Sequence, residues 1–141
     1  MEIRPFQPGE EGDVITLWDR CGLLRSWNDP REDIARKLRV QPELFLVGVI
    51  DSRLVATVMA GYEGHRGWVN YLAVAPEIRR EGYGRKMMDE AERRLRDLGC
   101  PKVSLQIRRV NGDVTAFYEQ LGYKEDEVIS MGKRLVHDRG A

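Results

Sequence analysis

The chain has 141 residues, and its 23 basic and 23 acidic side chains give a formal net charge of zero. A hydrophobic content of 42% with 33% charged residues is typical of a globular protein rather than a disordered one. The neutral charge disfavours a dedicated nucleic-acid-binding protein, which usually carries a basic face. No apolar run approaches the length of a membrane span, so a membrane partner is not expected either.

Cysteine usage and the first residues favour a reducing compartment. Cys21 and Cys100 have no neighbouring histidine cluster, and two cysteines make neither a zinc site nor a disulfide framework. The start at Met1 lacks the charged-then-apolar pattern of a signal peptide. We therefore expect a cytoplasmic protein with reduced thiols and without a metal.

No repeat, low-complexity stretch or linker divides the sequence, so a single domain is expected over residues 1–141. A short strand is predicted over 2–6. Apolar side chains spaced i, i+3, i+4 and i+7 then predict an amphipathic helix from Val14 to Cys21. Asn28-Asp29-Pro30 is a typical helix start and predicts a second helix through about Leu38.

The middle of the chain has the pattern of strands. Two apolar runs over 44–50 and 54–62, separated by an Asp-Ser turn, predict a hairpin. A polar, glycine-flanked loop over 63–67 leads to another strand over 68–74, which Pro76 terminates.

The last part of the chain alternates helices and strands. Apolar spacing predicts a long helix over 85–98, and it is followed by a strand over 102–107, a helix over 111–121 and a final strand near 129–136. The whole order predicts an α/β protein with a mixed α+β sheet, in which helices flank a central mixed β-sheet and one parallel crossover contains the long helix.

The segment 79–86, Arg-Arg-Glu-Gly-Tyr-Gly-Arg-Lys, lies between a predicted strand and the long helix. Backbone N–H groups at a helix N-terminus carry partial positive charge, and glycines let a phosphate approach the backbone. Residues 77–86 include four basic and two acidic side chains, a local charge of +2. We therefore predict an anion site suited to a pyrophosphate, with a solvated turn as the alternative interpretation.

Two common phosphate-binding motifs do not fit this segment. The dinucleotide fingerprint requires a third glycine where this chain has Met87, and a P-loop requires Gly-x4-Gly-Lys followed by Ser or Thr. Dinucleotide binding and nucleoside triphosphate hydrolysis are therefore disfavoured.

Three motifs occur in order between residues 68 and 123. They are the segment 71–77, the set Arg79, Gly82 and Gly84, and the set Asn111, Tyr118, Gly122 and Tyr123. The second resembles the acyl-coenzyme A motif of the GNAT superfamily of N-acetyltransferases. The first is similar to the family's splayed fourth strand, and the third to its Asn-x6-Tyr-x3-Gly-aromatic ending. The segment 23–30 further resembles small bacterial YpeA-type members, and the element order is similar to the GNAT-like acyl-CoA N-acyltransferase fold.

The resemblance implies acetyl-CoA as co-substrate, bound largely through backbone atoms. Amides from Arg80 to Arg85 would hold the pyrophosphate, and the main chain of Leu72 and Val74 would bond the pantetheine arm and polarise the thioester carbonyl. The implied coenzyme-binding positions are Leu72, Ala73, Val74, Arg79, Arg80, Gly82, Tyr83, Gly84, Arg85, Lys86, Asn111 and Tyr118.

Tyr118 occupies the position from which members of this family commonly protonate the departing thiolate. Val114, Phe117 and Leu121 share its helical stripe, so a purely packing role is the alternative. Because Asn111 lies seven residues upstream, as in the family's motif, we predict that Tyr118 is the catalytic acid.

The general base is open between Glu63, His65 and a water chain. Ribosomal-protein N-terminal acetyltransferases would place a glutamate where this chain has Gln106, and glutamine cannot accept the proton. Glu63 is the first candidate, because its loop leads into the strand that carries the donor site. A hairpin loop with solvated side chains is the alternative for Glu63 and His65 alike.

The predicted function is an N-acetyltransferase that moves an acetyl group from acetyl-CoA to a primary amine of a small molecule or protein, by direct attack in a ternary complex. A non-catalytic module that binds acetyl-CoA or CoA as a sensor is the alternative. Residues 27–29 lie where this family lines its acceptor pocket, although a helix cap at Asn28 or Asp29 is the favoured interpretation. The family often pairs through sheet edges, so a homodimer is a plausible assembly.

Overall fold

The computed structural model describes residues 1–139, so the last two residues of the domain expected over 1–141 lie outside it. The strands are β1 (Glu2–Pro5), β2 (Phe45–Ile50), β3 (Arg53–Tyr62), β4 (Gly67–Val74) and β5 (Val103–Leu105). The α-helices are α1 (Glu11–Arg20), α2 (Pro30–Lys37), α3 (Tyr83–Asp97) and α4 (Gly112–Gln120). Short 3-10 turns are η1 (Pro8–Glu10), η2 (Pro42–Leu44) and η3 (Pro76–Ile78).

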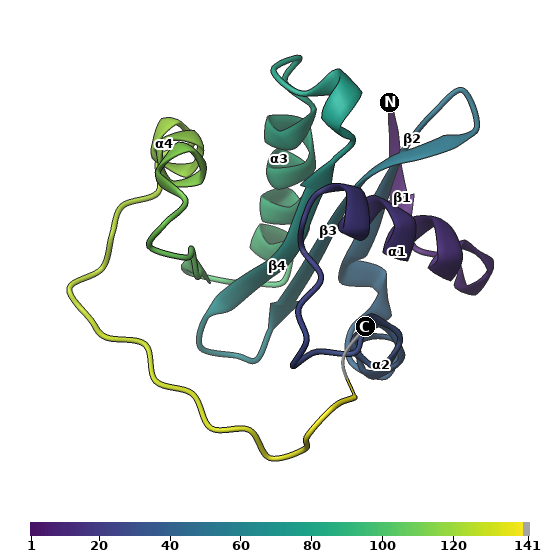
Figure 1. Cartoon of the computed structure of the whole chain (residues 1–141). Coiled ribbons are helices and arrows are strands. Elements are labelled where there is room, and N and C mark those ends of the chain that lie inside the picture. The colour runs from purple at the N-terminus through teal and green to yellow at the C-terminus, as the bar shows by residue number, and fades with distance from the viewer. Residues whose placement is uncertain (140–141) are drawn as a thin grey trace.

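The five strands form one sheet in the order β1-β2-β3-β4-β5. The first three pairings are antiparallel, and β4 pairs with β5 in parallel through the crossover that contains α3. Figure 1 shows the helices on both sides of this sheet, with α4 set apart from α1 and α2. The mixed sheet flanked by helices is therefore as predicted.

Alternation along the central strands builds a core on each face of the sheet. Phe45 and Val47 of β2 belong to the buried cluster that includes Trp18 of α1, whereas Leu46 belongs to the cluster that includes Met88 of α3. Successive side chains of a strand point to opposite faces, so a strand of continuous apolar residues is buried on both sides. This packing fixes α1 and α2 on one face and α3 on the other.

A bulge interrupts β4. Thr57 of β3 pairs with Ala73, but Met59, two residues further along β3, pairs with Asn70, so β4 carries one extra residue between these positions. Tyr71 lies in this interval with a φ of 52°, in the left-handed region that a tyrosine rarely adopts. The bulge therefore changes the direction of β4 in its second half.

Buried polar contacts hold this bulge in place. The fully buried Thr57 hydroxyl donates to the carbonyl of Tyr71 at 2.8 Å and accepts from the indole Nε1 of Trp18 at 3.0 Å. The Tyr71 ring stacks on Trp18 with ring centroids 3.7 Å apart. Helix α1, strand β3 and the bulge of β4 are thus connected by one side chain.

Strands β4 and β5 pair over only three residues. The ladder runs from Gly67 opposite Val103 to Val69 opposite Leu105 and ends there. Beyond Val69 the strands separate, which leaves that edge of β4 unpaired by β5 and makes β5 shorter than the predicted 102–107 strand. The separation begins just before the bulge.

The prediction of a final strand near 129–136 is wrong. Residues 127–139 form no helix or strand, and Figure 1 shows this segment, in yellow, running away from the sheet toward α2. Its end is held there by the Asp138 carboxylate, which accepts from Arg36 Nη1 and Nη2 at 3.1 and 2.6 Å. Side chains of Val128, Ile129, Met131, Leu135 and Val136 are consequently 62–87% exposed.

The Thr57 contact makes a first prediction about stability. Thr57→Val keeps the side-chain shape but leaves the Trp18 N–H and the Tyr71 carbonyl without their partner, so we expect a loss of about 1–3 kcal/mol in the free energy of unfolding. Urea denaturation followed by tryptophan fluorescence measures it. Thr115→Val is the matched control, because Thr115 is exposed on α4. Equal effects of the two substitutions would contradict the structural role of the Thr57 hydroxyl.

Candidate functional site

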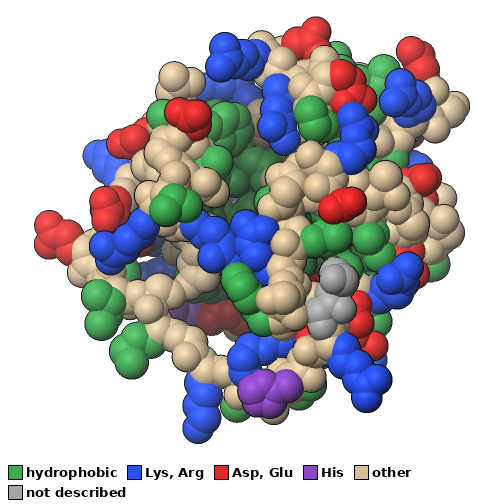
Figure 2. Space-filling model, in the orientation of Figure 1, with side chains coloured by type: hydrophobic (Ala, Val, Ile, Leu, Met, Phe, Trp, Pro, Cys, Tyr) green, Lys and Arg blue, Asp and Glu red, His purple; other side chains and the backbone are tan. Residues whose placement is uncertain are grey.

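A cleft of about 680 Å³ opens where β4 and β5 separate. Figure 2 shows this face hollowed, with hydrophobic side chains in the depth and Lys and Arg side chains beside them. The lining residues are Leu23, Arg25, Asn28, Asp33, Arg36, Lys37, Met59, Val69, Asn70, Tyr71, Leu72, Leu105, Gln106, Ile107, Arg108, Asn111, Val114 and Tyr118. Both separated strand ends contribute, so the bulge and the cleft are parts of one feature.

The glycine segment forms the N-terminus of α3, which begins at Tyr83 rather than at the predicted Arg85. Gly82 is the N-cap and has a φ of 85°, a conformation that favours glycine. The Lys86 N–H bonds to the Gly82 carbonyl at 3.1 Å, so the N–H groups of Tyr83, Gly84 and Arg85 have no partner within the helix. These N–H groups are available to an anion.

Gly84 lets α3 and α4 approach each other closely. A Cβ at this position would lie 3.1 Å from Cζ of Phe117 in α4, which is closer than such contacts normally are. The second glycine of the motif therefore serves helix packing. Its effect is to bring the N-terminus of α3 beside the helix that carries Tyr118.

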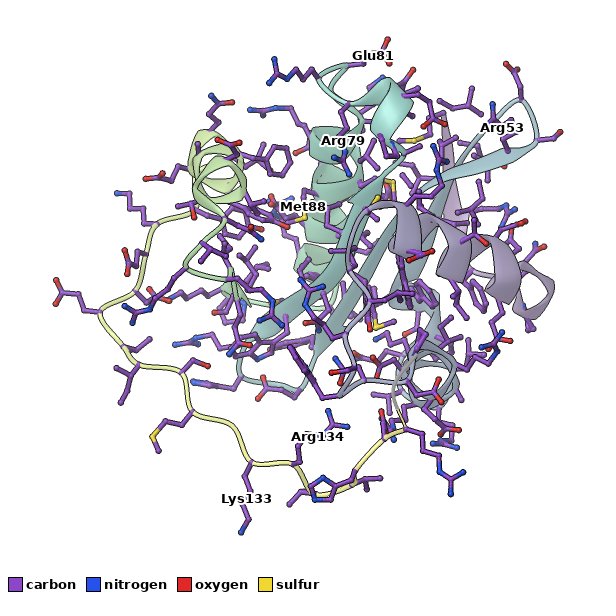
Figure 3. All side chains as sticks on the ribbon, in the orientation of Figure 1. Arg53, Arg79, Glu81, Met88, Lys133 and Arg134 are labelled. Atoms are coloured by element: carbon purple, nitrogen blue, oxygen red, sulfur yellow. The ribbon has the colours of Figure 1, made fainter. Side chains whose placement is uncertain are left out.

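The basic side chains of the segment 79–86 form no ion pairs with carboxylates of residues 1–139. Arg79 Nε donates to the Val74 carbonyl and Arg85 Nη2 to the Gln120 carbonyl, both at 3.3 Å, and Figure 3 shows Arg79 beside the start of α3. The Lys86 ammonium lies 5.2 Å from the centre of the Tyr83 ring. Among residues 1–139, none of the basic side chains of 79–86 forms an ion pair. The local positive charge is thus available to a ligand.

Tyr118 is a buried phenol at the wall of the cleft. Its side chain is 8% exposed and meets the rings of Phe117 and Tyr123 edge-on, with centroids 5.1 and 5.6 Å away. Burial raises the pKa of Tyr118 to about 12, because the phenolate would lose its hydration. The phenol is therefore protonated at neutral pH and can donate a proton.

Three of the predicted site residues meet at the cleft, namely Leu72, Asn111 and Tyr118. Ala73 is buried and pairs with Thr57, and the Val74 carbonyl is occupied by Arg79. The positions from Arg79 to Lys86 do not line the cleft. Arg79 to Gly82 form the turn before α3, and Tyr83 to Lys86 form its first turn.

The structure does not bring Glu63 or His65 to the cleft. Both lie in the loop between β3 and β4, at the end of β4 opposite to the bulge. The Glu63 carboxylate accepts from the backbone N–H groups of Arg66 and, at 2.7 Å, of His65. These hydrogen bonds lower the pKa of Glu63, because they stabilise the carboxylate. The carboxylate thus organises its own loop.

One face of α2 was missed by the sequence reasoning. Asp33, Arg36 and Lys37 line the cleft at the i, i+3 and i+4 spacing of a helix, which was the available signal. The Tyr71 hydroxyl donates to Asp33 at 2.6 Å. Burial, together with the carboxylate of Asp33, raises the pKa of Tyr71 above its usual value. This bond ties α2 to the bulge.

The connection between α1 and α2 approaches the cleft, as the resemblance implied. Asp29 caps α2 by accepting from the Arg31 N–H at 2.9 Å, which confirms its predicted capping role. Asn28 does not cap; it lines the cleft and accepts from Arg134 at 2.7 Å. The Trp27 ring lies 5.1 Å below the Arg108 guanidinium. Of residues 27–29, only Asn28 lines the cleft.

Two further findings concern the described residues. None of the helices in 1–139 is long and apolar enough to cross a membrane, and no group of three or more His, Cys, Asp or Glu side chains there is arranged to hold a metal ion. Cys21 and Cys100 are free thiols in this structure.

Comparison with known proteins places the chain in a family. The model of the acetyltransferase (GNAT) family matches residues 13–123. A Pectobacterium atrosepticum protein named as an acetyltransferase is 47% identical over 139 residues, which covers 99% of each chain.

Solved structures share the fold. The PaiA N-acetyltransferase from Thermoplasma acidophilum, in complex with coenzyme A, has a TM-score of 0.77 at 22% identity and covers 91% of this chain and 92% of its own. The ribosomal-protein-S18-alanine N-acetyltransferase from Escherichia coli has a TM-score of 0.74 at 19% identity, covering 89% of this chain and 78% of its own. With the family match and the relative at 47% identity, the chain belongs to the acetyltransferase (GNAT) family.

Proposed function

We propose that this protein transfers an acetyl group from acetyl-CoA to a primary amine inside the cleft between β4 and β5. The observation that carries the proposal is the juxtaposition of an unpaired strand edge at Leu72, a buried protonated phenol at Tyr118 and the adjoining N-terminus of α3. Membership of the acetyltransferase family and a structural neighbour holding coenzyme A support it.

The donor would bind along a line from α3 to the cleft. Unpartnered N–H groups at residues 83–85 suit a pyrophosphate, and the basic side chains around them add charge. From there the unpaired edge of β4 at Leu72 offers backbone groups to the amide-bearing pantetheine arm, as a strand edge does to an added strand. Asn111, at the N-terminus of α4, adds a polar side chain to the same cleft.

Transfer then follows from this placement. The amine nitrogen attacks the acetyl carbon, the C–S bond breaks, and the leaving thiolate takes one proton from the Tyr118 hydroxyl. The nitrogen loses one proton to water, and the Tyr118 phenolate regains one proton from water. Backbone N–H groups at the bulge would stabilise the negative charge that develops on the carbonyl oxygen. Among the described lining residues there is no Cys, Ser, Thr or His, which supports direct attack over a covalent acetyl-enzyme.

Water is proposed to remove the proton of the amine. A primary amine with a pKa near 10.4 is mostly protonated at pH 7, so a route for the proton is required. Of the predicted bases, Glu63 and His65 do not line the cleft, and Gln106 accepts no proton. The cleft itself is polar enough to hold ordered water.

The first test is selective binding. Acetyl-CoA and CoA should raise the melting temperature of the protein, whereas ATP and NAD at equal concentration should raise it much less, because they lack the pantetheine arm that the β4 edge would bind. Differential scanning fluorimetry with the four ligands measures this. Stabilisation by ATP or NAD alone would overturn the proposal.

The second test concerns the acid. Tyr118→Phe removes only the proton that the thiolate would take, so kcat should fall about a hundredfold while the Kd for acetyl-CoA stays within about twofold. Thiol release detected with a disulfide reagent gives kcat, and calorimetry gives Kd. An unchanged kcat would remove the acid role.

Tyr123→Phe is the matched control for this test. Tyr123 contacts the Tyr118 ring but does not line the cleft, and its hydroxyl donates to Glu92 at 2.7 Å. Its loss should alter stability and leave kcat nearly unchanged. A large fall in kcat for both variants would point to disturbed packing instead of a lost proton donor.

The third test concerns the base. Glu63→Gln and His65→Ala should reproduce the parent pH profile of kcat/KM, because these side chains lie in a hairpin loop outside the cleft. A shift of the acidic limb in Glu63→Gln would restore Glu63 as the base predicted from the sequence and would replace the water route.

A turnover measurement distinguishes the proposed enzyme from the alternative of a non-catalytic acetyl-CoA-binding module. A sensor of acetyl-CoA would be stabilised by it but would release no thiol in the presence of amines. A homodimer and a cytoplasmic location remain predictions from the sequence.

A further inference from the structure

The half of the cleft away from α3 has an uneven charge. Four cationic side chains, Arg25, Arg36, Lys37 and Arg108, line the cleft with a single carboxylate, Asp33. The chain as a whole is neutral, so this surplus is local. These side chains come from the α1–α2 connection, from α2 and from the segment after β5, and the fold brings them to one cleft.

One of the four cations is already neutralised. Arg36 forms a two-pronged contact with the Asp138 carboxylate at 3.1 and 2.6 Å and lies 3.5 Å from Asp33. The contact shows that a carboxylate fits at this rim of the cleft. Paired guanidinium and carboxylate groups cancel, so Arg36 offers little charge to a further ligand.

The other three cations have no carboxylate partner within residues 1–139. Arg25 uses Nη1 on the carbonyls of Gly22 and Leu24, at 2.7 and 2.9 Å, which leaves Nη2 and Nε. The Arg108 guanidinium is held by stacking on Trp27, which uses none of its N–H donors.

Lys37 is a partly buried cation of the cleft lining. Its ammonium donates to the Ala60 carbonyl, and burial lowers the pKa of Lys37 because the charged form loses hydration. An anion bound beside it would offset this penalty. These three lining cations, Arg25, Lys37 and Arg108, are referred to below as the anion-binding end of the cleft, for the role proposed there.

Asp33 places a negative charge in the cleft, beside Tyr71. Its carboxylate accepts from Tyr71, the residue of the bulge next to Leu72, where the donor thioester would lie. An ammonium or amine near Asp33 would therefore lie toward the reacting end, and an acid attached to it would lie toward the three cations.

We propose that the acceptor is a small primary amine that carries an acidic group, a carboxylate or a phosphate, bound at the anion-binding end. The inference rests on the proposed function and names its acceptor class. Small size follows from the C-terminal segment, which borders this end: Arg134 donates to Asn28, and Figure 3 shows Arg134 pointing toward the body of the protein while Lys133 points away.

The test compares amines that differ only in the acid. Thiol release from acetyl-CoA is measured with β-alanine and β-alaninamide, and with phosphoethanolamine and ethanolamine, with putrescine as a dicationic amine. We expect kcat/KM to be at least about tenfold higher for an acid than for its neutral counterpart, because charge-assisted hydrogen bonds are the stronger ones. The two pairs show whether the carboxylate or the phosphate is preferred.

Variants locate the effect. Arg25→Gln with Arg108→Gln should reduce the acid preference to about threefold or less. Arg109→Gln, at an exposed neighbour outside the lining, should preserve both the preference and the release with ethanolamine. Acetyl-CoA stabilisation measured by fluorimetry checks that each variant is folded.

Binding of acetylated products tests the inference about the acceptor without requiring turnover. In the presence of CoA, N-acetyl-β-alanine or N-acetyl-phosphoethanolamine should raise the melting temperature more than N-acetyl-β-alaninamide does. Faster release with neutral amines or putrescine would overturn the inference and leave the proposed function standing. Stabilisation by acetyl-CoA without release for any amine would overturn the proposed function, and the N-acetyl acids would then decide the inference by binding alone.

Discussion

The hydrogen bonds of the Thr57 hydroxyl are the constraint on which the site depends. This buried group joins the Trp18 indole of α1 to the Tyr71 carbonyl of β4, and so holds a tyrosine in a left-handed backbone conformation inside a strand. A strained position persists only where its surroundings fix it. The bulge at Tyr71 lies beside the point where β4 leaves β5, so a core contact determines the geometry of the cleft.

The cleft that results lies between two positive regions of different character. Toward α3 the attraction comes from backbone N–H groups and the basic segment 79–86, which is typical of phosphate binding at a helix N-terminus. Toward α2 it comes from cationic side chains on separate elements. Between them lie the Leu72 edge and the Tyr118 phenol, where the acetyl group would be transferred to the amine. The overall charge of zero therefore conceals two local positive regions.

Much of the fold was predictable because local rules agreed with the tertiary packing. The apolar stripe of α3 and the continuous apolar run of β2 predicted a helix and a strand correctly. Each element buries the apolar side chains that its helical or extended geometry places on one face or on both. The strand predicted near 129–136 failed because its apolar residues find no partner. The contact of Asp138 with Arg36, 102 positions apart, draws the segment to α2, and no local pattern records it.

The sequence by itself determined the family, the order of elements as far as α4 and three residues of the cleft, because glycines, caps and motif spacings act over short stretches of chain. Only the tertiary structure decided which side chains share the cleft with them. It placed the predicted loop of Glu63 away from the cleft, and it brought Asp33 to the hydroxyl of Tyr71. The proposed acceptor pocket would be built from side chains that are distant in sequence, and they share a cleft only because β4 and β5 separate.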